Sequence, residues 1–154
     1  MQQPGMEFAF EIRVDISAGK LMEMGNTAKG LRKIVPLMGG TFEGPNIKGT
    51  ILPGGYDWQL IRHDEVAEIE ARYVLKTDDG DLITIVNTGL RHGPADIMQR
   101  IAMGEPVDQS AYYFRSIPVF ETSSPEYDWL NSHISIATGI RKVNEVLIQV
   151  WKVL

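Results

Sequence analysis

Residues 68–87, EIEARYVLKTDDGDLITIVN, hold the pattern that decides the fold class of this chain. Glu70 and Arg72 share one face of an extended segment, and the residues that alternate with them are apolar, which is typical of a half-buried strand. The TDDG sequence at 77–80 follows, and an Asp-Gly pair favours a tight hairpin because it tolerates positive φ. Residues 81–87 return as a strand, and the run at 57–62 precedes the pair, so three consecutive antiparallel strands are expected.

The rest of the chain consists of similar short runs, separated by glycine and proline. Between Phe8 and Ile16 every second residue is apolar, so Phe8 and Phe10 are expected on the same buried face. The last run is apolar on both faces, which indicates burial on both sides. The further strands are expected at 32–37, 40–43, 47–52, 112–120, 131–141 and 145–153.

One helix is expected among the strands. Pro94 precedes residues 95–103 and Gly104 follows them, and this order of proline and glycine is typical of a helix start and a helix end. Residues 17–30 are polar and contain glycine, so they are expected to form a loop or a weak hairpin.

These elements predict a mainly β protein with a single small antiparallel β-barrel of about 8–10 strands and one short helix near one end. A barrel is favoured over a sandwich because closure leaves no strand edge exposed. The expected organisation is a flexible N-terminus at 1–7, followed by one β-barrel domain at 8–154.

Composition excludes several classes of function. The chain has no cysteine, so disulfides, thiolate catalysis and zinc bound by cysteine are ruled out. The net charge is −5 and the basic residues are scattered, which argues against nucleic acid as a partner. No apolar stretch approaches the roughly 20 residues that span a bilayer, and no signal peptide is recognisable, so a cytoplasmic protein without membrane contact is expected.

Several sequence blocks, in the same order, resemble the domain-of-unknown-function 3237 family. They are GGTFEGP at 39–45, LPGGYDW at 52–58, ARY at 71–73, TDDG at 77–80, YYFR at 112–115, FET at 120–122 and WLN at 129–131. The resemblance extends from about Phe8 to Leu154. It implies a small bacterial β-barrel protein with no established reaction and no agreed catalytic residues to carry over.

Two groups of residues are candidates for ligand binding. Asp57 and Trp58 follow a glycine turn, where a carboxylate beside an indole could bind or deprotonate a small molecule. Tyr113 and Arg115 share a strand face, and Glu121 joins them if the strand stays regular past Pro118. If that face lines the barrel lumen, the three groups would form an acid–base and oxyanion site; otherwise Arg115 and Glu121 are expected to form a structural ion pair.

Three further residues complete the candidate set. Arg72 would grip an anionic ligand if its face lines the lumen, and is ordinary surface if that face meets solvent. His92 precedes the helix and could face a barrel mouth, and Trp129 lies in one of the family blocks. The histidines lack the spacings that metal sites favour, so neither a metal nor a cofactor is expected.

Three functions remain open from the sequence. The first is a small-molecule-binding barrel with a polar and aromatic pocket, and the second is a cofactor-independent acid–base enzyme of the isomerase or cyclase type. The third is a structural or interaction protein whose barrel is fully packed. A small organic ligand and a homo-oligomer, of which a dimer is the simplest form, are the expected partners.

Overall fold

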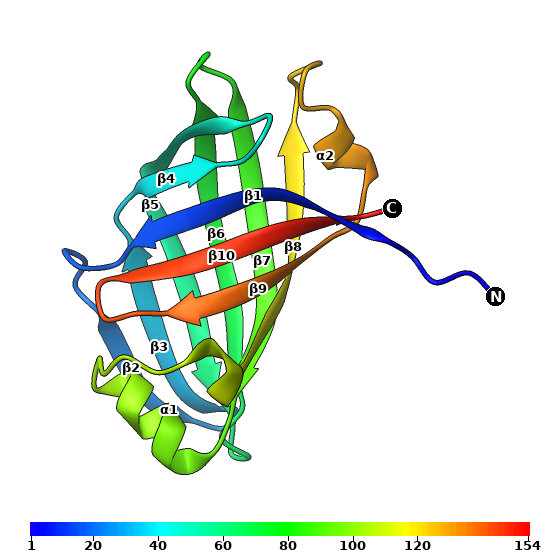
Figure 1. Ribbon diagram of the computed structural model, residues 1–154. Helices are drawn as coiled ribbons and strands as arrows, with labels where there is room; N and C mark the ends of the chain where they lie inside the picture. The colour runs from blue at the N-terminus through cyan, green and yellow to red at the C-terminus, as the bar shows by residue number, and fades with distance from the viewer.

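The computed structural model describes all 154 residues and has ten strands and two α-helices (Figure 1). The strands are β1 (Met6–Asp15), β2 (Met22–Thr27), β3 (Gly30–Leu37), β4 (Gly40–Glu43), β5 (Lys48–Ile61), β6 (Ala67–Thr77), β7 (Leu82–His92), β8 (Tyr113–Thr122), β9 (Ser135–Arg141) and β10 (Glu145–Val153). The helices are α1 (Ala95–Ala102) and α2 (Trp129–Ser132), and a 3₁₀ turn covers Gln109–Ala111.

Eight of the strands close into an antiparallel barrel, as the sequence predicts. The order around the ring is β5-β4-β1-β10-β9-β8-β7-β6, and β6 closes the ring by pairing with β5. The β2–β3 hairpin stands outside the ring, because β3 pairs with the second half of β5 after β4 has paired with the first half. The segment at 17–30 is therefore partly a strand that pairs in this hairpin.

The barrel has two walls that cross each other in Figure 1, with β1, β9 and β10 in front of β6, β7 and β8. Strands β8 and β9 pair only at Arg115↔Thr138 and Ser116↔Ala137. The sheet bends sharply at this short pairing, which lets one continuous sheet form both walls.

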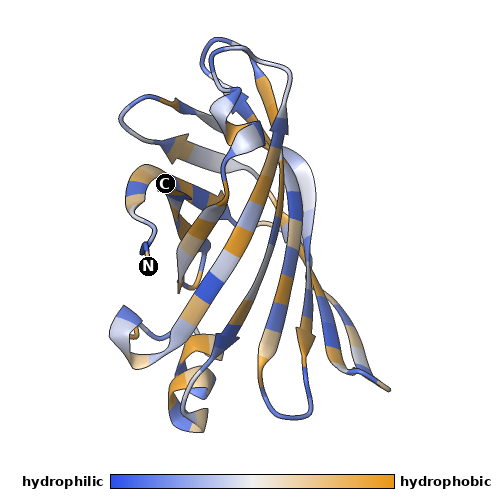
Figure 2. Ribbon diagram, turned by 90° about the vertical axis from the view of Figure 1, so that its right-hand side faces the viewer, coloured by the Kyte–Doolittle hydropathy of each residue, from blue (hydrophilic) through white to orange (hydrophobic).

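Alternate residues fill the barrel, and Figure 2 shows the resulting change of hydropathy along each strand. A single cluster of 23 buried apolar residues occupies the interior, and Phe10, Ile12 and Leu75 within it have no exposed surface. Most of the lumen is therefore a packed core, and any open space must lie where polar residues interrupt it.

Phe8 does not share the buried face of Phe10, contrary to the expectation from alternation. Phe8 pairs with Trp151 and Phe10 with Val150, so a β-bulge at Ala9 shifts the register between them. The bulge turns Phe8 to the outer wall, where its ring meets Trp151 edge to face at 5.4 Å.

Strand β5 joins two runs that the sequence separates at the glycine turn. The pairs Leu52↔Val74 and Tyr56↔Arg72 leave three residues of β5 opposite one residue of β6, so the glycine turn is a three-residue bulge within one strand. A side chain at Gly55 would come within 2.5 Å of the Arg72 carbonyl oxygen, so only glycine fits this contact. Asp57 lies two residues after the bulge, and its side chain enters the lumen.

Helix α1 and the segment after it close one end of the barrel (Figure 1). Ile101 of α1 and Tyr112 belong to the buried core, and Gly104 lies against Val143 in the turn between β9 and β10. Helix α2 takes the first residues of the strand expected at 131–141, so that β9 begins only at Ser135, and it lies beside β8 near the other end. Neither helix has the length and apolarity that crossing a bilayer requires.

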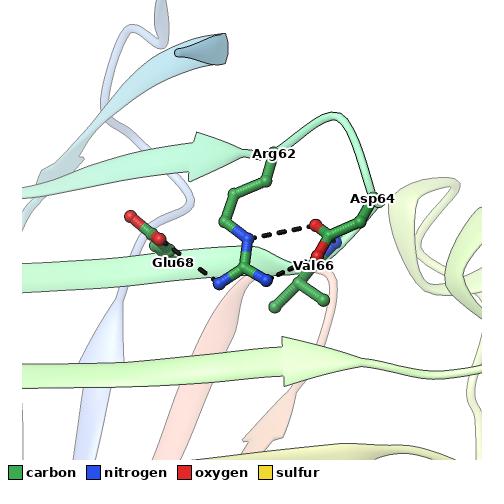
Figure 3. Close-up of polar contacts among 4 residues, drawn as sticks. All are labelled: Arg62, Asp64, Val66 and Glu68. Atoms are coloured by element: carbon green, nitrogen blue, oxygen red, sulfur yellow. Dashed lines mark hydrogen bonds and ion pairs between the residues drawn. The ribbon is translucent and has the colours of Figure 1, made fainter.

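An ion-pair cluster fixes the turn between β5 and β6 (Figure 3). Arg62 donates two hydrogen bonds to Asp64, at 3.0 and 2.5 Å, and a third to Glu68 at 3.5 Å. The backbone N–H of Val66 also donates to Asp64. The Arg62 guanidinium holds the pKa of Asp64 at about 2.

Candidate functional site

A polar cluster interrupts the apolar core on the inner wall toward the α1 end. Asp57 and Gln59 of β5, Tyr73 of β6, and Asn87 and Arg91 of β7 all line one small cavity of about 30 Å³. Such a volume holds roughly one water molecule. Asp57 pairs with Ala71 and Ala71 pairs with Asn87, so Asp57 and Asn87 lie level with each other on the two strands that flank β6.

Asp57 is a buried carboxyl group that no cation neutralises by direct contact. Its residue is 8% exposed, and the oxygens accept hydrogen bonds from Gln59 Nε2 at 2.9 Å and from the Glu70 backbone N–H at 3.2 Å. Burial raises the pKa of Asp57 above its ordinary value, against the opposing effects of these hydrogen bonds and of Arg91 and Arg141. A carboxyl in this setting keeps its proton to higher pH than an exposed aspartate.

Two arginines give the cluster its positive charge. Arg91 is 8% exposed, and its guanidinium lies over the Phe114 ring at 5.4 Å from the centroid. Burial lowers the pKa of both Arg91 and Arg141, and the neighbouring Arg141 charge lowers that of Arg91 further. Neither arginine has a carboxylate oxygen within 4.0 Å.

Three buried polar atoms of the inner wall have no hydrogen-bond partner. They are Asn87 Oδ1, Arg91 Nε and Ser116 Oγ. A buried polar group without a partner costs about 1–3 kcal/mol, so native proteins leave few of them. Their concentration on β7 and β8 marks this part of the lumen as a surface with unused hydrogen-bonding capacity.

The tyrosines complete the cluster with phenol groups. Tyr73 is buried, and both its burial and the charge of Asp57 raise the pKa of its phenol, so it stays protonated. The Tyr112 hydroxyl accepts a hydrogen bond from the backbone N–H of Arg141 at 3.0 Å, which ties the segment after α1 to β9. Asp57 in its protonated form can donate a proton, and the two guanidinium groups and the phenol can stabilise a negative oxygen.

The candidate residues from the sequence do not meet inside the barrel. Arg72, Tyr113, Arg115 and Glu121 are all exposed on the outer wall, because the inward positions of β6 and β8 are taken by the residues that alternate with them. The expectation that an arginine, a tyrosine and a carboxylate converge in the lumen through these residues is therefore wrong. Arg115 and Glu121 form no ion pair either.

Trp58, Tyr113 and Arg115 instead line a broad outer groove of about 1130 Å³. The Arg115 guanidinium lies 5.5 Å from the centroid of the Tyr113 ring, and its Nη1 donates to the Phe114 carbonyl oxygen at 2.9 Å. Trp58 is 47% exposed and Tyr113 44% exposed. The groove also contains Ile117, so an apolar surface lies open to solvent on this wall.

The remaining candidates lie elsewhere. Arg72 and Glu121 line a second outer groove, of about 650 Å³, beside the β5 bulge. His92 is exposed and stacks on the Tyr113 ring at 4.8 Å between centroids, and Trp129 starts α2 with Lys152 Nζ 5.2 Å from its ring centroid. Of the whole set, Asp57 alone reaches the lumen.

Arg91 and Asn87 are the inner residues that the sequence analysis missed. Strand β7 was expected to end at Asn87, but it continues to His92. Read to that length, its inward positions are Ile83, Ile85, Asn87, Gly89 and Arg91. A polar residue on an otherwise apolar face is the signal that would have found both residues.

Comparison with known proteins places this geometry in a family. The model for the family described as "Protein of unknown function (DUF3237)" matches residues 4–153. A UPF0311 protein of Rhodopseudomonas palustris is 39% identical over 151 residues, which cover 98% of this chain and 99% of that one. The crystal structure of a conserved protein of unknown function from Rhodopseudomonas palustris is 37% identical, with a TM-score of 0.94 and complete coverage of both chains.

A more distant relative has a named activity. A protein of Penicillium herquei named "Hydroalkoxylation enzyme phnH" is 25% identical over 151 residues, which cover 97% of this chain and 84% of that protein. The family match extends over nearly the whole chain and agrees with the sequence blocks and the closed barrel, so the chain belongs to the DUF3237 family of proteins of unknown function.

Proposed function

We propose that this protein is an acid–base enzyme that transfers protons to and from a small organic molecule at Asp57. The observation that supports this most directly is a buried carboxyl group whose raised pKa keeps it protonated to higher pH, beside two arginines that no carboxylate contacts. Titratable groups with strongly perturbed pKa values gather at functional sites, because a general acid needs a pKa near the working pH.

The roles of the residues follow from their chemistry. Asp57 donates the proton, and its hydrogen bonds from Gln59 and Glu70 N–H fix the orientation of the carboxyl group. Arg91 and Arg141 stabilise the negative charge that develops on a substrate oxygen. Tyr73 remains a neutral hydrogen-bond donor beside them.

The activity named for the Penicillium herquei relative suggests a reaction of this type. Hydroalkoxylation adds an O–H group across a C=C bond, and when both groups belong to one molecule the substrate and the product are isomers. In the reaction proposed here, Asp57 gives its proton to one alkene carbon while the substrate oxygen bonds to the other. The hydroxyl proton of the substrate then returns to the Asp57 carboxylate, and the enzyme is regenerated.

The substrate enters at the end of the barrel that α1 covers. A cavity of about 30 Å³ is too small for an organic substrate, so the α1 segment has to move aside. Gly93 and Gly104 flank this helix, and Gly104 has a left-handed backbone with φ of 78°. Ile101 and the Tyr112–Arg141 hydrogen bond are the contacts that must release.

Deuterium incorporation tests the proposal. Phenols that carry a pendant alkene are incubated with the protein in D₂O, and cyclised product is analysed for a single new C–D bond. We expect product from the wild type, none from Asp57→Asn, and wild-type amounts from Glu121→Gln, whose side chain lies exposed on the outer wall.

An equal rate in Asp57→Asn and in the wild type would mean that Asp57 is not the proton donor. Absence of deuterated product from every alkenyl phenol tried with the wild type would refute the proposal as a whole. Circular dichroism spectra of both variants establish that the comparison is between folded proteins.

A further inference from the structure

We infer that the molecule accepted by the lumen is an organic anion bearing a further hydroxyl group, with its negative oxygen held by Arg91. This inference names the substrate class of the site and rests on the proposed function for the location of the reaction. It starts from a charge that the protein itself leaves without a partner.

Arg91 is a buried cation that has no carboxylate partner. The residue is 8% exposed, its Nε has no hydrogen-bond acceptor, and its closest described partner is the face of the Phe114 ring. Removing a guanidinium from water costs several kcal/mol unless a counter-charge and hydrogen bonds compensate. A π face returns only a small part of that cost.

The charge balance of the cluster favours an anion. Arg91 and Arg141 are the cations that act electrostatically on Asp57, and Asp57 is the one carboxyl group among the cavity-lining residues. While Asp57 keeps its proton, the buried guanidinium of Arg91 has no counter-charge among the cavity-lining residues. The half-buried Arg141, whose Nη1 donates to the Lys142 carbonyl oxygen, adds a second positive charge nearby. A bound carboxylate or phenolate supplies the missing negative charge, and a guanidinium fork suits either of them.

The other unpartnered atoms give the second part of the inference. Asn87 Oδ1 is a buried acceptor that lacks a donor, and Ser116 Oγ is a hydroxyl that lacks any partner. Asn87 is four residues before Arg91 on the same inward face of β7, so the two side chains stand about 13 Å apart along the strand at their Cα atoms, and both line the same cavity. A hydroxyl group at the other end of the ligand from the anionic oxygen would donate to Asn87 while the anion pairs with Arg91.

Binding of matched probes tests this inference without any substrate turnover. Isothermal titration compares 4-hydroxybenzoate with 4-hydroxybenzamide, which have the same size and hydroxyl group but differ in charge. We expect the wild type to prefer the carboxylate by about tenfold or more, as a charge-assisted hydrogen bond provides. Arg91→Gln should lose this preference, and Arg115→Gln on the outer wall should keep it.

A second readout separates a binding role of Arg91 from a merely structural one. Without ligand, Arg91→Gln should unfold at the same denaturant concentration as the wild type or a higher one, because it removes an unpaired buried charge. A structural role for Arg91 would instead lower the midpoint. Equal affinity for the two probes, no binding of either, or unchanged preference in Arg91→Gln would each overturn the inference.

The failure of this inference can be told apart from the failure of the proposed function. Asp57→Asn should retain the preference for the carboxylate while losing deuterium transfer. Anion binding without any proton transfer would leave the ligand class standing and refute the catalytic role. Proton transfer to neutral compounds with no anion preference would leave Asp57 as the acid and refute the assignment of Arg91.

Discussion

Phe8 and Phe10 offer a matched test of the barrel wall, because they stand two residues apart and face opposite sides of it. Phe10 has no exposed surface, and its ring centroid lies 5.9 Å from that of Phe42 and 5.6 Å from that of Phe120. Phe8 is 36% exposed and has a single aromatic contact, with Trp151. Truncating either residue to alanine removes the same atoms from two different environments.

The structure predicts unequal costs for the two substitutions. Phe10→Ala opens a cavity among three packed rings, and truncating a fully buried phenylalanine costs about 3–5 kcal/mol. Phe8→Ala leaves no cavity, because solvent fills the space. It loses one edge-to-face contact and part of its buried area, for a cost of about 1 kcal/mol.

Equilibrium unfolding in urea, with thermal melts beside it, measures this difference. For a domain of this size about 1 kcal/mol corresponds to roughly 2–4 °C in Tm, so Phe10→Ala should melt roughly 6–20 °C below the wild type and Phe8→Ala roughly 2–4 °C below. Similar losses in both variants would mean that the bulge at Ala9 does not exist and that both rings point inward.

Three further outcomes are expected. Asp57→Asn should flatten the pH dependence of the free energy of unfolding. The folded-state pKa of Asp57 is raised above 3.8, so the stabilisation that comes from its bound proton is fully present below that pH. This stabilisation is lost as the pH rises through the folded-state pKa. Urea titrations at several pH values check this, and parallel curves for variant and wild type would contradict it. Gly139→Ala should lower the free energy of unfolding by about 1–3 kcal/mol, because its Cβ would lie 2.7 Å from three ring atoms of Phe114. The double variant with Phe114→Leu, which has no ring at this position, should recover part of that loss. Losses that simply add in the double variant would count against the contact. The exposed apolar surface around Trp58 and Ile117 should be covered in a homodimer, so light scattering is expected to give twice 17.2 kDa for the wild type and 17.2 kDa for Ile117→Lys, whereas a monomeric wild type would refute this.

Local patterns in the sequence predicted most of the architecture. The β6–β7 hairpin follows from strict alternation and the Asp-Gly turn, and the position of α1 follows from Pro94 and Gly104. The bulge at Ala9 could not be read in the same way, because alternation within one strand does not reveal an extra residue in its pairing. That pairing joins β1 to β10, which are at opposite ends of the chain.

The candidate site was harder to predict, because the choice of inner face depends on closure of the barrel. Arg72 and Arg115 alternate with apolar residues as regularly as Asn87 and Arg91 do, so each strand alone allows either face to be inward. The closed ring decides the matter by burying Tyr73 and Phe114, and it sends Arg72 and Arg115 to solvent. Asp57 was found because a glycine turn made it conspicuous, although its partners Arg91 and Arg141 come from other strands.

The three-residue bulge in β5 has a consequence for evolution by insertion and deletion. It adds an even number of residues relative to β6, so Ile51 before it and Asp57 after it face the same side. Loss of a single residue from 53–55 would exchange the two sides for the remainder of the strand, setting the indole of Trp58 inside and the carboxyl group outside. Insertions or deletions at 53–55 are therefore tolerated only if they change the length by an even number of residues. Relatives of this protein that keep an aspartate at position 57 should keep this rule.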